Sequence, residues 1–159
     1  MHRDLKPANL MFVAAAPDAN DSSPEKADTV VKVIDFGVAK ALVEKPDAMG
    51  LTHGGFVGTP AFASPEQFND ARVDVRSDIY SLGAVVYEML TGEPPHSAPT
   101  AQATIAKLLT EEARSVAVLR RTVPYHMDGA VLRALEKLPA DRFTSARSFS
   151  EALQGKAHV

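Results

Sequence analysis

A helix near the middle of the chain constrains the fold more than any other feature of the sequence. Apolar side chains recur there at helical spacing, and neighbouring ones widen the apolar surface: Ile79, Leu82, Ala84, Val85, Val86, Met89 and Leu90. A helix that is apolar around most of its circumference is buried on most sides, so the rest of the chain has to pack around it. Ser77 is a plausible N-cap, Thr91-Gly92 ends the helix, and Pro94-Pro95 prevents a restart.

Three further helices are predicted C-terminal to this one. The first runs through residues 105–109, the second begins near Asp128 and stops at Pro139, and the third begins near Ser145. Each carries apolar side chains on one face: Ile105, Leu108 and Leu109; Val131, Leu132, Leu135 and Leu138; Phe149 and Leu153. The C-terminal half is therefore expected to be helical.

The N-terminal half is expected to be extended and irregular. Leu10–Val13 and Val30–Ile34 are apolar and partly β-branched, which predicts two short strands. The loop between them, residues 14–29, is rich in Ala, Asp, Pro and Ser. Residues 35–66 hold five Gly and three Pro without a sustained period, as functional or disordered segments do. Together these patterns predict a mostly helical α+β fold.

Composition narrows the function classes. The net charge is -3 over 159 residues, so we expect no surface for nucleic acid. The chain has no Cys and no apolar run of the roughly 20 residues that a membrane span needs. The basic residues His2, Arg3 and Lys6 precede a short apolar run, as in a signal peptide, but Asp4 lies among them. We therefore expect a cytoplasmic protein.

The chain opens with HRDLKPAN, residues 2–9. This motif resembles the catalytic loop of protein kinases, whose pattern is H-R-D-L-x-x-x-N. Phosphoryl transfer to a hydroxyl needs an acceptor for the hydroxyl proton, a cation near the moving phosphoryl group and oxygen ligands for Mg²⁺. Asp4, Lys6 and Asn9 match these three roles. The alternative is a polar N-terminal tail with helix-capping residues.

A second motif, Asp35-Phe36-Gly37, follows the second predicted strand. In protein kinases this Asp binds Mg²⁺, and the Phe packs to set the active state. By itself an Asp just before a Gly is a common turn. Its position after the catalytic loop favours the kinase interpretation, so Asn9 and Asp35 are the predicted metal ligands.

A third motif, GTPAFASPE, covers residues 58–66 and resembles the end of a kinase activation segment. By this resemblance Thr59 faces the catalytic loop and helps to select a Ser or Thr hydroxyl, and Lys6 points to the same class. The alternative for Thr59 is a turn residue before Pro60. Thr52 is a candidate regulatory phosphosite.

Two more motifs resemble segments that support a kinase site structurally. Arg3, in the opening motif, is expected to have a supporting role as well. In DVRSDIYSLG, residues 74–83, Asp78 is expected to accept hydrogen bonds from catalytic-loop N–H groups, although the helix dipole alone favours an acid there. In LPADRF, residues 138–143, Arg142 is expected to form a buried ion pair with Glu66. The alternative is a surface Arg beside Asp141.

Five motifs in the family's order cover nearly the whole chain, which therefore resembles the C-lobe of bacterial, eukaryotic-like serine/threonine kinases. The resemblance implies ATP and Mg²⁺ as cofactors, protein Ser/Thr side chains as substrates, and Met11 and Ile34 against the adenine. The implied boundaries are a partial kinase domain at 1–154, with catalytic loop 2–9, activation segment 35–66 and helical subdomain 77–154, and a tail at 155–159.

The sequence also departs from the family. It lacks the Gly-rich loop, the phosphate-binding Lys with its Glu partner, and the helices before the catalytic loop, and Phe62 stands where many relatives have Tyr. We expect the N-lobe to be encoded upstream of Met1, and the 159 residues alone to be inactive. The alternatives are a non-catalytic module that binds a partner near Ile105 and a degraded remnant. A binding module needs neither Asp4 nor Asp35, which favours a kinase fragment.

Overall fold

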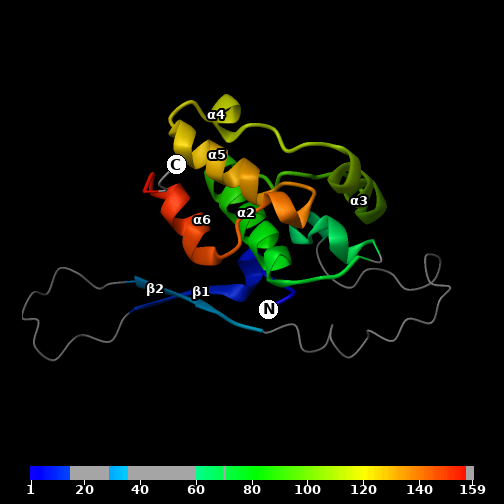
Figure 1. Ribbon diagram of the computed structural model, residues 1–159, viewed down its shortest axis with the longest axis horizontal. Helices are drawn as coiled ribbons and strands as arrows, with labels where there is room; N and C mark the ends of the chain where they lie inside the picture. The colour runs from blue at the N-terminus through cyan, green and yellow to red at the C-terminus, as the bar shows by residue number, and fades with distance from the viewer. Residues whose placement is uncertain (15–28, 36–59, 70, 157–159) are drawn as a thin grey trace, which may run out of the picture.

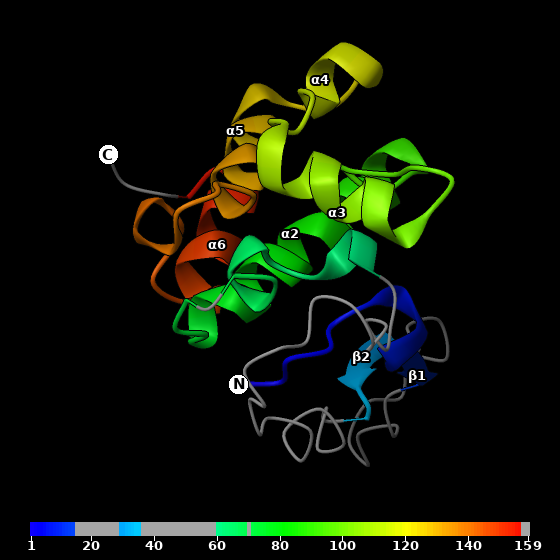
Figure 2. The ribbon, with the colours of Figure 1, turned by 90° about the vertical axis from the view of Figure 1, so that its right-hand side faces the viewer.

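Helix α2, Val75–Thr91, lies at the centre of the computed structural model, which describes residues 1–14, 29–35, 60–69 and 71–156 (Figure 1, Figure 2). Its N-cap is Asp74, whose carboxylate accepts a hydrogen bond from the Arg76 N–H at 2.8 Å. The sequence-based N-cap, Ser77, was wrong, because the helix begins earlier and Ser77 is buried inside its first turn. Gly92 ends the helix at φ 89°, as predicted, and its N–H donates to Glu88 O.

The predicted burial of α2 on most sides is confirmed, since eight of its residues are buried. Tyr80, Ala84 and Val85 pack in one apolar cluster, and Ile79 packs in a second. The other elements of these clusters are the 3₁₀ turn η2 (Pro60–Phe62), α3 (Ala101–Thr110), α4 (Val116–Leu119), α5 (Tyr125–Ala134) and α6 (Ala146–Leu153). Gly83 lets α5 come close, because a Cβ there would lie 2.8 Å from Ala134 Cβ.

Helix α5 differs from its prediction at both ends. It begins at Tyr125, after Pro124, rather than near Asp128, and it ends at Ala134 rather than at Pro139. Leu135 and Leu138 therefore lie beyond the helix, and Leu138 is exposed. Beyond the helix, the carbonyls of residues 136 and 137 accept hydrogen bonds from the Arg142 side chain, which holds this segment in place. A further 3₁₀ turn, η4 (Pro139–Asp141), follows.

Helix α4 was not predicted from the sequence. It has four residues, too few for a period to show, and its N–H groups are capped by two side chains. Ser115 Oγ accepts from the Val118 N–H, and Asp128 of α5 accepts from Ser115 Oγ at 2.9 Å and the Val116 N–H at 2.7 Å. Asp128 thus caps a neighbouring helix rather than its own. The cap of α6 is Ser145, as predicted.

The two predicted strands are present as an antiparallel hairpin at the edge of the helical body. Strand β1 is Leu10–Ala14 and β2 is Thr29–Val33, with Leu10 opposite Val33. The hairpin lies on the side of the molecule away from α4 (Figure 1, Figure 2). Because the strands are antiparallel, the start of β1 and the end of β2 share one end, and the functional residues are found there.

None of the helices in the described residues is both long enough and apolar enough to cross a membrane.

Candidate active site

Two polar side chains of the loop before β1, those of Asn9 and Lys6, contact the Asp4 carboxylate. Asn9 Nδ2 donates hydrogen bonds to Asp4 O at 2.8 Å and to Asp4 Oδ2 at 3.2 Å. Lys6 Nζ lies 3.4 Å from the same Oδ2. The 3₁₀ turn η1, Pro7–Asn9, folds Asn9 back toward Asp4, and the Asn9 N–H donates to Lys6 O. The structure therefore brings together the three residues that the sequence suggested for catalysis.

The hydrogen bonds of Asn9 fix the orientation of its amide. Asp4 O can only accept, so the amide nitrogen of Asn9 has to face it. The amide oxygen then lies on the opposite branch, directed away from Asp4 O. An amide oxygen is a hard ligand of the kind that Mg²⁺ prefers. One side chain can in this way support Asp4 and still offer an oxygen to a metal ion.

Asp35 follows the hairpin at the end where Asn9 precedes it. The Ile34 N–H donates to Asn9 O at 2.9 Å, so the backbones of the two segments are adjacent. Asp35 has φ 56°, in the left-handed region that costs energy for a residue with a Cβ, and its side chain is exposed. Unfavourable backbone conformations of this kind cluster at functional sites.

Asp78, in the first turn of α2, fixes the start of the loop. Its Oδ2 accepts from the His2 N–H at 2.6 Å and its Oδ1 from the Arg3 N–H at 2.8 Å. These are the bonds that the sequence motif predicted. Arg3 has φ 67°, again in the left-handed region, and Gln67 Nε2 donates to its carbonyl oxygen. The first turn of α2 and the turn η3, Pro65–Gln67, together stabilise this backbone conformation.

His2 connects the loop to the end of β2. Its Nδ1 accepts from the Asp4 N–H at 3.2 Å, and its Nε2 lies 3.1 Å from Ile34 O. A carbonyl oxygen cannot donate, so the Nε2 donates to Ile34 O while the Nδ1 accepts from the Asp4 N–H. His2 therefore ties the backbone of Asp4 to the residue just before Asp35.

Glu66 and Arg142 form the buried ion pair that the sequence predicted. Arg142 Nη1 lies 2.7 Å from Glu66 Oε1 and Nη2 lies 2.8 Å from Oε2, a bidentate geometry. The Ser77 hydroxyl also donates to Glu66 Oε1. Arg142 is 1% exposed, which excludes the alternative of a surface Arg. The pair fastens η3 to the segment after α5, behind the candidate site.

The protonation of Glu66 follows from its partners. Burial alone would raise the pKa of the Glu66 carboxyl, but hydrogen bonds from Arg142 and Ser77 and the Arg142 charge outweigh it, so the pKa lies below its ordinary value. The guanidinium carbon of Arg142 also lies 4.9 Å from the centre of the Tyr80 ring. The ionised pair is thus packed on all sides.

The two residues assigned to the adenine lie on the hairpin. Met11 is opposite Lys32 in the antiparallel register, and Ile34 extends the ladder through its bond to Asn9. Because side chains alternate along a strand, Ile34 has the same parity as Lys32 and Met11. Both side chains are exposed, at 49% for Met11 and 38% for Ile34. Their proximity to a nucleotide stays a prediction.

Several predicted positions lie outside the described residues. They are Phe36 and Gly37 of the second motif, the candidate phosphosite Thr52, the activation-segment residue Thr59 and most of the 155–159 tail. Phe62, which belongs to the predicted activation segment, is within the described residues and is buried in η2. Within the described residues, no group of three or more His, Cys, Asp or Glu side chains is arranged to bind a metal ion.

Three supporting residues were missed by sequence reasoning: His2, Gln67 and Ser77. Gln67 had a detectable signal, because Ser64-x-x-Gln67 is a capping-box pattern, and Gln67 Oε1 does accept from the Ser64 N–H at 2.9 Å. No signal in the sequence indicated the hydrogen bond from Ser77 to Glu66. Ser77 has the chemistry of an N-cap, and only the tertiary fold brings it to Glu66.

Known proteins of similar sequence are protein kinases, which agrees with the geometry of the site. Serine/threonine-protein kinase pkn3 of Myxococcus xanthus is 40% identical over 157 residues, which cover 97% of this chain and 27% of pkn3. Serine/threonine-protein kinase PknB of Mycobacterium tuberculosis is 36% identical over 146 residues, 92% of this chain and 21% of PknB. The chain thus spans about a quarter of the length of these relatives. The protein kinase domain family matches residues 1–155, and the chain belongs to that family, close to bacterial serine/threonine kinases.

Proposed function

We propose that the protein transfers the γ-phosphoryl group of ATP to serine or threonine side chains of other proteins. The observation that supports this most is the environment of the Asp4 carboxylate, between the Asn9 amide and the Lys6 ammonium. Hydrogen bonds to the backbone and side chain of Asp4 restrict its position, which general base catalysis requires.

Each residue has a distinct role in this proposal. Asp4 accepts the proton of the substrate hydroxyl as that oxygen bonds to phosphorus. Lys6, 3.4 Å from Asp4, supplies positive charge where negative charge develops. Asn9 orients Asp4 through its Nδ2. Thr59, which lies outside the described residues, is proposed to favour hydroxyl amino acids at the site.

The residues present fit Mg²⁺ and ATP. Asn9 and Asp35 offer an amide oxygen and a carboxylate from adjacent backbone segments, and oxygen donors suit Mg²⁺. Met11 and Ile34 offer an apolar, exposed surface next to these oxygens, which suits a planar base. Bound Mg-ATP would supply the phosphoryl group and the leaving group. We also propose a cytoplasmic location, where ATP is plentiful.

We further propose that residues 1–154 form the C-lobe of the kinase domain. The described part of the chain is a mostly helical body with one small hairpin, and the loop, hairpin end and α2 form one face of a site. A nucleotide placed against the hairpin would be covered on that side only. The opposing wall would come from an N-lobe.

The test is a pair of substitutions in the full-length protein. Asp4→Asn should lower phosphate transfer from radiolabelled ATP to a protein substrate by roughly 10²–10⁴-fold, while nucleotide affinity survives. Asp35→Asn should weaken Mg-ATP binding as well, because Asp35 meets the metal rather than the hydroxyl. Asp141→Asn, an exposed acid in η4, is the matched control.

Two results would contradict the proposal. Equal loss of nucleotide affinity in both variants would refute the division of roles between Asp4 and Asp35. A full-length protein that transfers no phosphate even without substitution would favour the non-catalytic, partner-binding alternative.

A further inference from the structure

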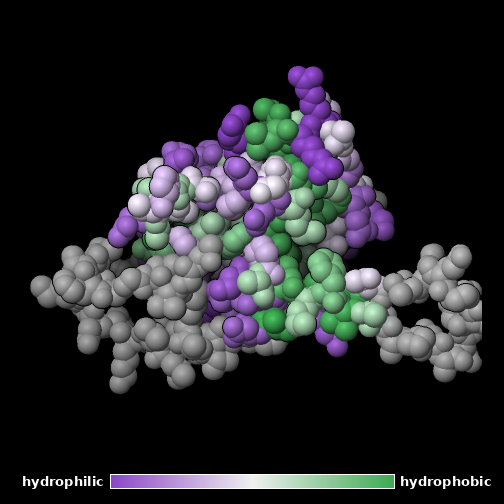
Figure 3. All heavy atoms as spheres, turned by 180° about the vertical axis from the view of Figure 1, so that it is seen from behind, coloured by the Kyte–Doolittle hydropathy of each residue, from purple (hydrophilic) through white to green (hydrophobic). Residues whose placement is uncertain are grey.

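The loop that carries Asp4 receives little packing support from the hairpin that follows it. All residues of β2 are exposed, and in β1 only Leu10 and Val13 are half-buried. Figure 3 shows hydrophobic side chains at the surface on the side of the molecule where the hairpin lies. The backbone around Asp4 therefore depends on hydrogen bonds, several of which come from the helical body.

Gln67, the last residue of η3, directs its side chain back toward this loop. Its Oε1 accepts from the Ser64 N–H at 2.9 Å, and its Nε2 donates to Arg3 O at 3.4 Å. The orientation of the amide follows from these partners, because an N–H can only donate and a carbonyl oxygen can only accept. The buried pair of Glu66 and Arg142 holds η3, so Gln67 reaches the loop from a fixed element.

The Arg3 carbonyl belongs to the peptide group that leads into Asp4. At the other side of this peptide group, the Asp4 N–H donates to His2 Nδ1 at 3.2 Å. Gln67 and His2 thus hold opposite sides of one peptide plane, and that plane sets the direction in which the Asp4 side chain leaves the backbone. Arg3 has φ 67°, an unfavourable conformation, so the plane should tend to rotate when one of these bonds is lost.

A structural role alone does not require Gln at position 67. The capping box needs only an acceptor for the Ser64 N–H, and Glu supplies one as well as Gln does. The contact with Arg3 O needs a donor, and a carboxylate in the same place would face a carbonyl oxygen. Gln67 also lines the small hollow that Asp4 and Lys6 line. The amide nitrogen therefore has a use that the helix cap does not have.

We propose that Gln67 is a positioning residue for phosphoryl transfer. Its Nε2 holds the Arg3–Asp4 peptide in the orientation in which the Asp4 carboxylate takes the proton of the substrate hydroxyl. This inference rests on the proposed kinase function, and Gln67 acts through Asp4 without touching a reacting atom. A displacement of about 1 Å can cost on the order of 10²-fold in rate, so a loosely held loop should slow the chemical step.

Gln67→Glu in the full-length protein separates the two roles, because it keeps the acceptor for Ser64 and removes the donor to Arg3. Its kcat should fall by roughly tenfold, its KM for ATP should stay within about twofold, and its melting temperature should equal that of the parent. Gln67→Ala removes both bonds, so it should lower kcat to a similar extent and the melting temperature as well. A similar loss of kcat in the uncharged Ala variant excludes the added carboxylate as the cause.

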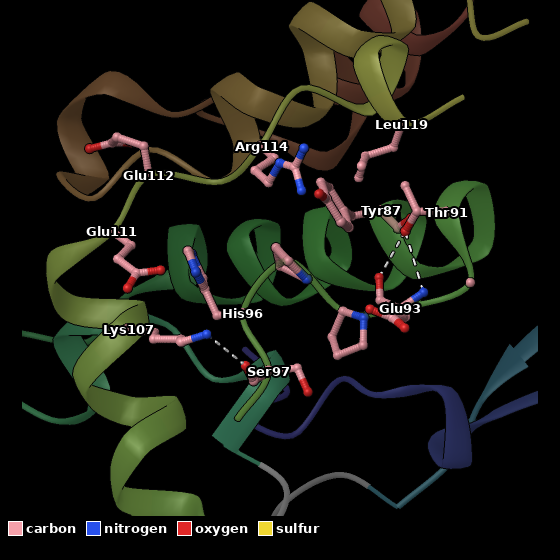
Figure 4. Close-up of a pocket in the computed structure, with 13 residues that line it drawn as sticks. Tyr87, Thr91, Glu93, His96, Ser97, Lys107, Glu111, Glu112, Arg114 and Leu119 are labelled. Atoms are coloured by element: carbon pink, nitrogen blue, oxygen red, sulfur yellow. Dashed lines mark hydrogen bonds between the residues drawn. The ribbon is translucent and has the colours of Figure 1, made fainter. Parts of the chain in front are cut away.

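Thr91→Val is the control for a loss of stability alone. Thr91 lies at the other end of α2, where its Oγ1 lies 2.8 Å from Glu93 O and accepts from the Glu93 N–H at 3.4 Å (Figure 4). This variant should lower the melting temperature and leave kcat unchanged at an assay temperature below the melt. Gln102→Glu makes the same substitution at an exposed position of α3 and should change neither quantity.

Hydrogen exchange, read by mass spectrometry, tests the role of Gln67 without turnover. In Gln67→Glu the segment 1–10 should exchange at least about threefold faster than in the parent, while α2 should not change. A parent that transfers no phosphate would refute the proposed function, whereas the exchange rate would still decide whether Gln67 holds the loop. In an active parent, a parental kcat or a parental exchange rate in Gln67→Glu would overturn the proposal. So would a rise in KM for ATP in place of the fall in kcat, or a melting temperature as low as that of Gln67→Ala.

Discussion

Arg142 has five N–H donors, and each has an acceptor. Two go to Glu66, and the others to the carbonyl oxygens of Arg76, Glu136 and Lys137. This complete pairing lets a charged side chain be almost fully buried. Either partner alone would be a stranded charge, and the removal of Arg142 would also take one donor from each of three backbone carbonyls.

We therefore expect Glu66→Ala and Arg142→Ala each to lower the free energy of unfolding by about 3–5 kcal/mol. The double variant should lose clearly less than the sum, since the second change removes a charge that the first had already left unpaired. Chemical denaturation of the full-length kinase measures all three. The pair Asp141→Ala and Arg147→Ala, both exposed, is the control and should be additive. Additive losses for Glu66 and Arg142 would rule out the coupling.

Some residues of the candidate site could be predicted from the sequence, whereas some of their contacts could not. Asp4, Asn9 and Asp35 were predictable because their chemistry and order form a motif. The ion pair of Glu66 and Arg142 could be expected from the same resemblance, but not its carbonyl acceptors. Those acceptors are backbone carbonyls beyond the end of α5, and only the tertiary fold brings them to Arg142.

Among the elements, α2 and α5 pack tightly against each other at Gly83. An ideal Cβ at Gly83 would lie 2.8 Å from the Ala134 Cβ, closer than carbon atoms pack, and Gly83 itself is buried. Neither atom is the end of a flexible side chain, so the helices would have to move apart.

Gly83→Ala should therefore destabilise the protein by about 1–3 kcal/mol, although Ala is the better helix former. Gly129→Ala is the matched control, because a Cβ at that position in α5 meets nothing within 4 Å. That variant should be neutral or more stable by up to about 1 kcal/mol. Thermal melts of both variants decide the matter, and a Gly83→Ala protein as stable as its parent would show that the two helices can separate freely.

Element boundaries were less predictable than element types. The position of α2 could be predicted from its long apolar periodicity, because a helix that is buried on most sides has apolar residues along its whole length. Its first residues, the ends of α5 and the whole of α4 were missed. Asp74 and Asp128 look alike in sequence as capping acids, and only the packed structure shows that Asp128 caps α4.

At the scale of the whole molecule, His96 lies where three parts of the helical body meet. It follows α2, and Lys137 Nζ lies 3.4 Å from its Nε2 while donating to Leu108 O of α3. Burial, followed by the charges of Lys137 and Lys107, lowers the pKa of His96 to about 4 from 6.5. A neutral imidazole can accept from the ammonium of Lys137, whereas a protonated one cannot.

This predicts a loss of stability in mild acid. The folded-state pKa is below the unfolded one, so as pH falls below 6.5 the unfolded state takes up the proton first. The free energy of unfolding should fall between pH 6.5 and about 4, by up to about 3 kcal/mol. Glu66 adds a separate loss only below about pH 4.5, since its folded pKa is lowered from that value.

The measurement is urea denaturation at several pH values from about 7.5 to 5, above the range in which Glu66 titrates. His96→Gln should flatten the pH dependence in this range. His126→Gln, at an exposed position, should leave it as in the parent. The same slope in the His96→Gln and parent proteins would exclude His96 as its source.

The exposed hairpin affects whether the 159 residues associate when they are expressed alone. Apolar side chains on both of its strands are exposed: Met11, Phe12, Val30, Val31, Val33 and Ile34. An exposed apolar patch that spans both faces of the hairpin favours association, as do strand edges that no described residue pairs. The face that carries Met11 and Ile34 is the proposed wall for the nucleotide, and Phe12 and Val31 lie on the opposite face. An uncovered hairpin therefore also leaves the phosphates accessible to water.

We therefore expect residues 1–159, expressed alone, to associate and to transfer no phosphate. Phe12 and Val31 face each other across the hairpin, so Phe12→Lys with Val31→Glu places an opposite-charge pair on the patch. This double variant should shift the chain toward monomer in size-exclusion chromatography with light scattering, without creating activity, because it reduces association and supplies no second wall. Val75→Lys with Leu138→Glu makes the same charge change at exposed positions outside the hairpin and should not alter association. A monomeric parent chain would refute the role of the patch, and phosphate transfer by the parent chain that disappears in Asp4→Asn would refute the need for an opposing lobe.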